Sequence, residues 1–188
     1  MSLLMTKDVP RYECLLEAAK EFPDLDPWAC AVFLHLLRAG DVVSGVSERN
    51  LARHNLSRGR FGVLMLLWRG TRRGDPAGGN GSCEAPGPHT PAELADAAGV
   101  ARATMTGLID TLERDGLVKR VPDTDDRRVL SVVLTPKAQQ LLRKVLPGHF
   151  QLMNTLLRSL SETECQRLVH LLNKIIEQAA ALHAAAVN

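Results

Sequence analysis

The sequence predicts a mainly α-helical fold with one small antiparallel β-hairpin. Apolar residues recur at helical spacing over most of the 188 residues. Two β-branched runs, 117–121 and 129–134, are separated only by the polar turn sequence PDTDDRR. In the second run Leu130, Val132 and Leu134 alternate, so they are expected on one face of the hairpin. Hydrophobic residues make up 45% of the chain and aromatic residues only 4%, a composition that suits a helical protein rich in Leu and Ala.

The first 70 residues predict three helices. The first begins at Pro10, a residue suited to a helix start, and ends before Pro23. Asp26 caps the second, which starts at a proline and keeps helical spacing through PWACAVFLHLLRAGDVVSGVSERNL. Ser57 caps the third, whose body FGVLMLLW is apolar all round and is therefore expected to be buried.

Residues 71–89 differ from the rest of the chain in composition. The stretch is rich in Gly and Pro and has no apolar periodicity, so it predicts a flexible loop. A loop of this length is either functional or disordered, and the composition favours disorder.

A helix-turn-helix is predicted immediately after this loop. Thr90 and Glu93 form a capping-box pattern around a proline at the first helical position. The short helix ends at Gly99, and a second helix with regularly spaced apolar residues stops at Asp115 and Gly116. Two short helices joined by a tight glycine-containing turn are typical of this motif.

Two further helices follow the predicted strands. Thr135 and Pro136 start a helix that is expected to end near Leu146, before Pro147. A second capping-box pattern, SETE at 161–164, opens a long amphipathic helix. One stripe of that helix is apolar and needs a partner surface, and it consists of Leu168, Leu171, Leu172, Ile175 and Ile176.

A helix-turn-helix followed at once by a hairpin is a winged helix. Its second helix can lie in the DNA major groove while the hairpin tip reaches an adjacent minor groove. Arg127 and Arg128 lie at the predicted tip and suit the narrow, negatively charged minor groove. Asp126 can hold one guanidinium in a bidentate pair, and so prepare it for entry.

Residues 90–142 resemble the DNA-binding lobe of the MarR family of bacterial winged-helix transcription regulators. The most specific part is D-x-R followed by a strand ending in L-T, which is met by Asp126, Arg128, Leu134 and Thr135. LERDGLVKR, before the first strand, matches the family's usual approach to that strand. The resemblance implies a homodimer with interlocked terminal helices, two winged helices on a pseudo-palindromic operator, and repression released by a small ligand.

With this resemblance, the chain divides into four regions. Residues 1–70 are the N-terminal helices for dimerisation and support, and residues 71–89 are the loop. Residues 90–135 form the winged helix-turn-helix lobe, and residues 136–188 are the C-terminal dimerisation helices.

The predicted recognition helix offers few side chains for reading bases. Ala101 stands where many family members have a capping serine, and Gly107 where a polar or basic residue is common. Arg102 can pair bidentately with guanine, and threonines can meet a thymine methyl group or a phosphate. The candidate DNA-binding residues are Arg102, Ala103, Thr104, Thr106, Lys119, Arg120, Asp126, Arg127 and Arg128.

The charge of the chain leaves two interpretations of this lobe open. Net charge is only +2, so DNA must be met by a local patch. Residues 101–128 contain six basic and six acidic side chains, so binding depends on which of them face DNA. The alternatives are a solvated, salt-bridged surface, or a winged helix that contacts another protein and has lost DNA binding.

For a small aromatic or anionic ligand, the resemblance points to the junction of the first two long helices with the winged-helix lobe. Side chains that can stack or bind an anion there are Trp28, His35, Arg38, Arg60 and Trp68. Core packing is the simpler interpretation of the two tryptophans. Phenolic-ligand and urate-binding relatives carry a carboxylate near the position of Gly62. This chain has no carboxylate at that position, which argues against a place in that branch of the family.

Cys30 offers a thiol-based redox sensor as an alternative. Family sensors use nearby tyrosines, and this chain has only Tyr12, so a buried inert thiol is the preferred interpretation. Cys83 and His89 lack a second ligand pair at metal spacing, so neither a metal nor another cofactor is expected.

Three further observations bear on the class of protein. No GxSxG, P-loop or HExxH motif is present, so an enzyme is not expected. No signal-peptide pattern opens the chain, and the four cysteines are scattered without a CxxC. The longest apolar run, 63–68, is too short to cross a bilayer, so a cytoplasmic protein without a membrane partner is expected.

Overall fold

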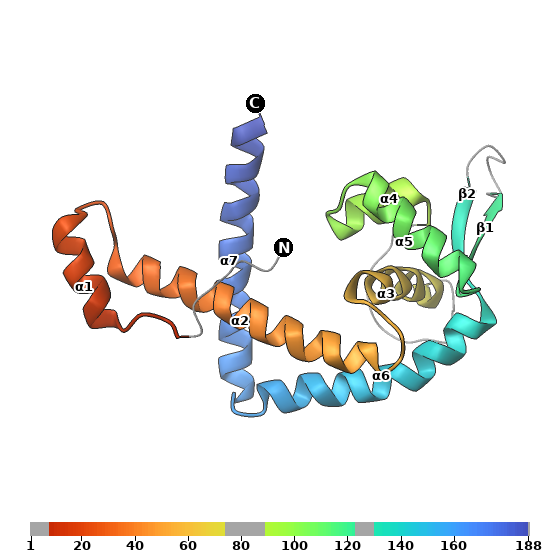
Figure 1. The fold of residues 1–188 in the computed structure, drawn as a ribbon, viewed down its shortest axis with the longest axis horizontal. Coiled ribbons are helices and arrows are strands. Elements are labelled where there is room, and N and C mark those ends of the chain that lie inside the picture. Colours follow the sequence, from red (N-terminus) through yellow and green to blue (C-terminus); the bar gives the residue numbers. More distant parts are fainter. Residues whose placement is uncertain (1–7, 74–88, 123–129, 188) are drawn as a thin grey trace. The chain divides into compact units, whose positions relative to one another are not determined.

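The computed structural model describes residues 8–73, 89–122 and 130–187. The chain forms two compact units, Met1–Leu146 and Pro147–Asn188. The fold is mainly helical with one two-stranded hairpin, as predicted (Figure 1). In chain order the elements are α1 (Tyr12–Glu21), α2 (Pro27–Ala52), α3 (Arg58–Arg73), α4 (Pro91–Ala98), α5 (Arg102–Arg114), β1 (Val118–Pro122), β2 (Leu130–Leu134), α6 (Pro136–Leu157) and α7 (Glu162–Val187).

The predicted helix ends are confirmed where local chemistry defines them. Thr90 Oγ1 accepts a hydrogen bond from the Glu93 amide at 3.2 Å, and a Glu93 carboxylate oxygen accepts one from the Thr90 amide at 3.0 Å. These two bonds complete the capping box at the start of α4. Gly99 ends α4 with φ +63°, a left-handed conformation that glycine adopts without strain.

The hairpin pairs β1 and β2 in antiparallel register, with Val118 opposite Leu134 and Pro122 opposite Leu130. Val132 and Leu134 are buried, as the predicted alternation requires. Leu130 was expected on the same buried face, but it is exposed. Its partner Pro122 is the last residue of β1, so this pair lies at the end of the hairpin farthest from the buried pair Val118 and Leu134.

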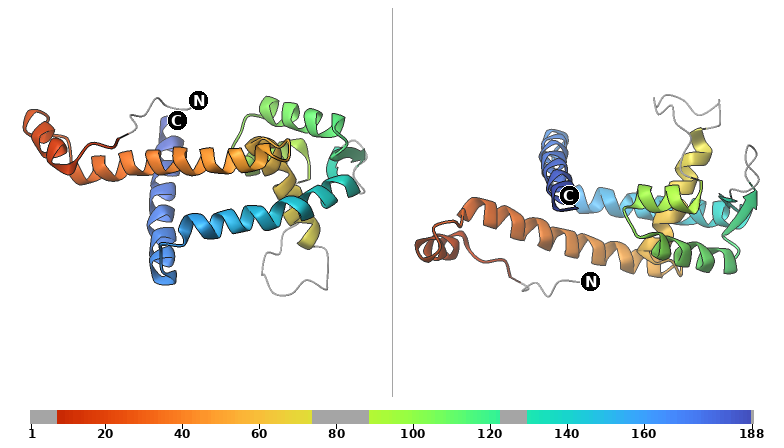
Figure 2. Two further views of the ribbon diagram at one scale, coloured as in Figure 1. Left: turned by 60° about the horizontal axis from the view of Figure 1, so that its bottom comes forward. Right: turned by 90° about the horizontal axis from the view of Figure 1, so that it is seen from above.

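One hydrophobic core joins α3, α4, α5, the hairpin and the first half of α6. Two further views also show α4 and α5 beside α3, in agreement with their packing contacts (Figure 2). Leu64, Leu94 and Ile109 are completely buried in this core. The expectation that α3 is buried all round is confirmed only in part, because Met65 and Leu66 are half-buried and line a cavity.

The predicted end of α6 near Leu146 is wrong. The helix continues through Pro147 to Leu157. Proline within a helix removes a single hydrogen bond to the carbonyl four residues earlier. The apolar residues Phe150, Met153 and Leu157 follow at helical spacing, so the residues on both sides of the proline support the same helix. The boundary between the two compact units falls at this proline.

The long helices α2 and α7 expose large apolar side chains. The stripe predicted on α7 is solvent-facing in the single chain at Leu168, Leu171, Ile175 and Ile176. In α2, an 18-residue window has a mean hydropathy of 1.5, with only 6% of it buried. The helix therefore passes a length and composition test for membrane spans, which the longest apolar run did not indicate. A helix that packs against a second protein chain passes the same test.

Candidate nucleic-acid interface

Helix α5 turns one face to the core and leaves the opposite face open. Met105, Ile109 and Leu112 recur at helical spacing, and all three are completely buried. This packing fixes the rotation of the helix about its axis. The exposed positions of its N-terminal half are Arg102, Ala103, Thr104, Thr106 and Gly107. Four of these five residues are predicted DNA contacts, and the structure brings them together on one surface.

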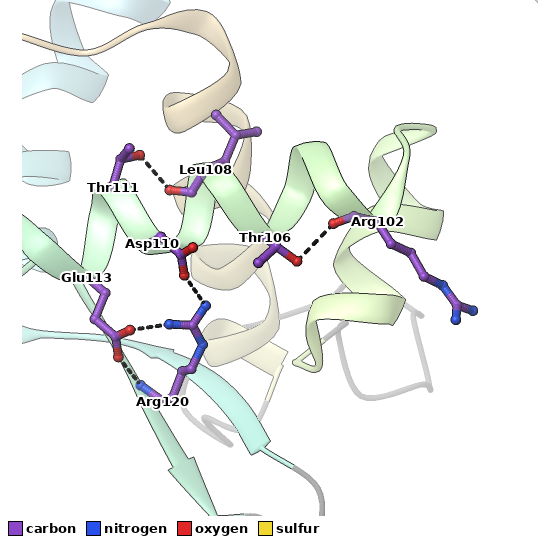
Figure 3. Close-up of polar contacts among 7 residues, drawn as sticks. All are labelled: Arg102, Thr106, Leu108, Asp110, Thr111, Glu113 and Arg120. Carbon is purple, nitrogen blue, oxygen red and sulfur yellow. Dashed lines mark hydrogen bonds and ion pairs between the residues drawn. The ribbon is translucent and has the colours of Figure 1, made fainter.

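The N-terminal half of α5 has few stabilising contacts of its own. Ala101, at its N-cap, makes no side-chain hydrogen bond to the helix. A Cβ atom at Gly107 would meet nothing within 4 Å. The Thr106 hydroxyl donates to the Arg102 carbonyl at 2.9 Å. Within the described part of the chain Arg102 forms no ion pair, and its side chain points away from the helix, which suits contact with an external anion (Figure 3).

The C-terminal end of α5 is held from two other helices. Asp115 forms an ion pair with Arg60 of α3. Lys137 Nζ of α6 donates to the Asp115 carbonyl at 2.7 Å. A cation at this end is favourable because the helix dipole places partial negative charge on the last carbonyl groups. These contacts fix the end of the helix opposite to Arg102.

A second ion-pair cluster joins α5 to β1. The Arg120 guanidinium contacts the Glu113 carboxylate through Nη1, and Asp110 Oδ1 through Nη2 at 2.6 Å (Figure 3). The Arg120 amide also donates to Glu113 Oε1 at 3.0 Å. The hydrogen bond to Asp110 is the main cause that raises the pKa of Arg120 above its ordinary value, so the guanidinium stays charged.

The other predicted DNA contacts differ in their surroundings. Lys119 is exposed on β1, whereas the side chain of Arg120 is only 24% exposed and bound to two carboxylates. Asp126, Arg127 and Arg128 lie outside the described residues, so their predicted roles at the wing tip stay predictions.

The five predicted ligand residues do not line one cavity. Trp28 is 66% exposed, with its ring centroid 4.4 Å from that of Tyr12, so core packing is the wrong interpretation for this residue in the single chain. Arg38 lies ten residues further along α2, about 15 Å at the rise of an α-helix. His35 Nδ1 donates to the Ala31 carbonyl at 2.7 Å. Arg60 pairs with Asp115, and Trp68 is half-buried against the core.

A cavity with other lining residues lies between α3, α4 and α5, where the second of the two long helices meets the winged-helix lobe. Its volume is about 490 Å³, and its lining includes Gly59 and Gly62 of α3 together with Met105 and Leu108 of α5. Ala97, Ala98 and Val100 line it as well, with Arg58 and Arg69 as its charged residues. A glycine pair one turn apart in an otherwise apolar helix is a signal that could have indicated this space. Three separate segments build the cavity, so no single segment of the sequence predicts it.

The described thiols and histidines give no metal site. No group of three or more His, Cys, Asp or Glu residues that could hold an ion occurs within residues 8–73, 89–122 and 130–187. Cys83 lies outside these ranges. Cys30 was expected to be buried, but it is only half-buried in the single chain. It lies at the N-terminal end of α2, of which only a small part is buried by the other residues that the structure describes.

Comparisons with known proteins agree with this architecture. The MarR family model matches residues 82–130. The HTH-type transcriptional repressor YetL of Bacillus subtilis (strain 168) is 31% identical over 172 residues, which cover 92% of this chain and 95% of that protein.

Solved structures share the fold. The MepR–DNA complex of S. aureus has a TM-score of 0.64 at 18% identity, over 78% of this chain and 94% of that chain. BpsR of Bordetella bronchiseptica, whose DNA binding is regulated by 6-hydroxynicotinic acid, has a TM-score of 0.58 at 25% identity, over 75% of this chain and 90% of that chain.

Proposed function

The chain belongs to the MarR family of winged-helix transcriptional regulators, and we propose that it is a homodimeric repressor of a pseudo-palindromic operator, released by a small ligand. Its family is one of DNA-binding regulators and not of enzymes. Repression is proposed because YetL, a relative that matches 92% of this chain, is a transcriptional repressor. Such a regulator works in the cytoplasm, at the nucleoid.

The observation that carries DNA binding is the open face of α5. Its three buried residues aim Arg102, Thr104 and Thr106 away from the core. In a winged helix this is the face that enters the major groove. Arg102 is the one long cation among them, and we assign it to a guanine or a phosphate.

The homodimer is supported by the apolar faces of α2 and α7. Valine and phenylalanine side chains of α2, and leucine and isoleucine side chains of α7, are exposed in the single chain. Large exposed apolar surfaces mark interaction sites in soluble proteins. A second copy of the chain covers them in a two-fold arrangement, and a two-fold dimer matches the symmetry of a palindromic operator.

The ligand site we propose is the cavity between α3, α4 and α5 and not the five predicted residues. Its apolar lining and the two arginines suit a flat apolar molecule with an acidic group. Met105 and Leu108 belong both to the cavity lining and to α5. A ligand that binds more tightly when these side chains are displaced therefore shifts α5 away from its DNA-binding position.

DNA binding is tested with a duplex from the region upstream of the protein's own gene. We expect a dissociation constant that rises steeply with salt, because phosphate contacts release counterions. Arg102→Ala should weaken binding by about 1–3 kcal/mol, while Arg143→Ala, the same change on the exposed side of α6, should have little effect. Arg128→Ala should weaken binding with the dimer intact if the wing contributes. Binding that does not weaken as salt rises would contradict phosphate neutralisation as the main binding term. Absence of duplex binding would favour the protein-interaction alternative.

The cavity is tested by filling it. A Cβ atom at Gly62 meets nothing within 4 Å, so Gly62→Leu should occupy part of the space without disturbing the fold. We expect this variant to bind the duplex as the wild type does, but to lose release by a panel of aromatic carboxylates. Release that is unchanged in Gly62→Leu would place the ligand elsewhere.

A further inference from the structure

We infer that Arg120 is a positioning residue that locks β1 to α5, and that it does not contact DNA. The expected effect of Arg120 on DNA affinity rests on the proposed function. The attachment of β1 to α5 is a property of the single chain and does not depend on DNA. It replaces the role that the sequence indicated for Arg120.

Arg120 reaches α5 through three nitrogen atoms. Its amide and Nη1 both contact the Glu113 carboxylate, and Nη2 contacts Asp110. Asp110 and Glu113 lie three residues apart, so their side chains project from the same side of the helix. The planar guanidinium spans both carboxylates, which lysine with its single point charge cannot do in the same way.

The edge of β1 explains why this contact is needed. The sheet described here has two strands, and β2 already has a neighbour on its outer side, because the Val132 amide donates to the His89 carbonyl at 2.7 Å. The outer edge of β1 has no strand beside it in the described sheet, so its amides need other partners. Glu113 supplies that partner for Arg120, and ties the edge to the recognition helix.

The charges in the cluster argue against a phosphate contact. Two carboxylates and one guanidinium leave the cluster with one net negative charge. A phosphate group would have to displace both carboxylates from a side chain that is only 24% exposed. Arg102 is exposed and has no ion pair among the described residues, so it offers its charge without this competition.

Four variants in one binding series separate the two roles. If Arg120 positions α5, Arg120→Gln and the double variant Asp110→Asn with Glu113→Gln should each weaken DNA binding about tenfold. The triple variant should bind no more weakly than Arg120→Gln, because all three share one interaction. Arg114→Gln removes the same charge from an exposed residue of α5 and serves as the control. The melting temperature identifies any variant that has lost its fold.

If Arg120 contacts DNA, the double variant should change the DNA affinity in the opposite direction. Removing the two carboxylates would then free the guanidinium and remove negative charge near the phosphates, so the double variant would bind more tightly than the wild type. That result, or a triple variant in which the changes add, would overturn the inference.

Hydrogen exchange tests the lock in the absence of DNA. In Arg120→Gln and in the double variant, the amides of β1 should exchange faster while those of the buried residues in α3 stay protected. Unchanged exchange in β1 would refute the lock. If the wild type fails to bind the duplex, the proposed function fails for that duplex, and the exchange result still decides whether Arg120 holds β1 to α5.

Discussion

The winged-helix region and helix α7 use similar apolar residues in opposite ways. Ile109 of α5 is completely buried by its own chain, whereas Ile176 of α7 is 62% exposed. The side chain of Ile109 is buried entirely by residues of its own chain, so its packing stabilises the fold of that chain. Ile176 lies on a helix face that is exposed among the described residues, and this face therefore offers a surface for a partner. Amphipathic periodicity alone predicts both helices and does not distinguish these two cases.

The largest effect should come from the completed core. Ile109→Ala removes a fully buried side chain, and we expect it to lower the free energy of unfolding by about 2–5 kcal/mol. The loss combines the transfer of the side chain with the cavity left behind. Chemical denaturation measures it, and a loss below about 1 kcal/mol would mean that α5 does not pack as described.

The matched substitution in α7 should behave differently. Ile176→Ala removes a side chain that is exposed in the single chain, so its cost should arise only where two chains associate. We expect a fall of about 1–2 kcal/mol in stability at high protein concentration, and almost none at dilutions where chains separate. Thermal unfolding over a series of concentrations measures this, and a cost independent of concentration would contradict the partner surface.

The capping box predicts a pH effect at the start of α4. Hydrogen bonds from the amides of Thr90 and His89 lower the pKa of Glu93 below its ordinary value. A lowered folded-state pKa stabilises the fold above the unfolded pKa of about 4.3, and the stabilisation is lost as the pH falls through the folded value.

Glu93→Gln tests this effect because glutamine does not titrate. The stability difference between the wild type and this variant should therefore be constant near neutral pH and shrink below about pH 4.5. A difference that stays constant down to pH 3 would contradict the assigned hydrogen bonds.

The smallest effect should come from the N-terminal half of α5. Gly107→Ala adds a methyl group that meets nothing within 4 Å. We expect an increase in stability of about 0.5–1 kcal/mol, because alanine has a higher helix propensity than glycine. A decrease in melting temperature would mean that this position has a neighbour which the single chain does not contain.

The features that the sequence predicted are local. Thr90, Glu93 and Gly99 lie within ten residues of one another, so their pattern defines the start and end of α4 without any tertiary contact. The order of elements in the winged helix, two short helices and then a hairpin, was likewise predicted from segments that follow one another directly in the sequence. The helix end predicted at Pro147 is wrong because that prediction rested on one proline and not on the apolar periodicity that continues on both sides of it.

The features that were not predicted depend on distant segments. Arg120 meets Glu113 and Asp110 only after the chain has turned from α5 into β1, so its charge indicated a DNA contact when the sequence was read alone. The lining of the cavity depends on Gly62 of α3 lying near Met105 of α5, which is more than forty residues away. Side-chain spacing within one element cannot give either arrangement.

Sedimentation equilibrium of the full chain tests the difference between the completed core and the uncovered helix faces most directly. We predict a species of twice the 20.5 kDa chain mass at micromolar concentration, which Ile176→Glu converts to the single-chain mass with the core of the winged-helix region still folded. A wild-type protein that remains at the single-chain mass would contradict the account, because the apolar faces of α2 and α7 would then have no second copy to cover them.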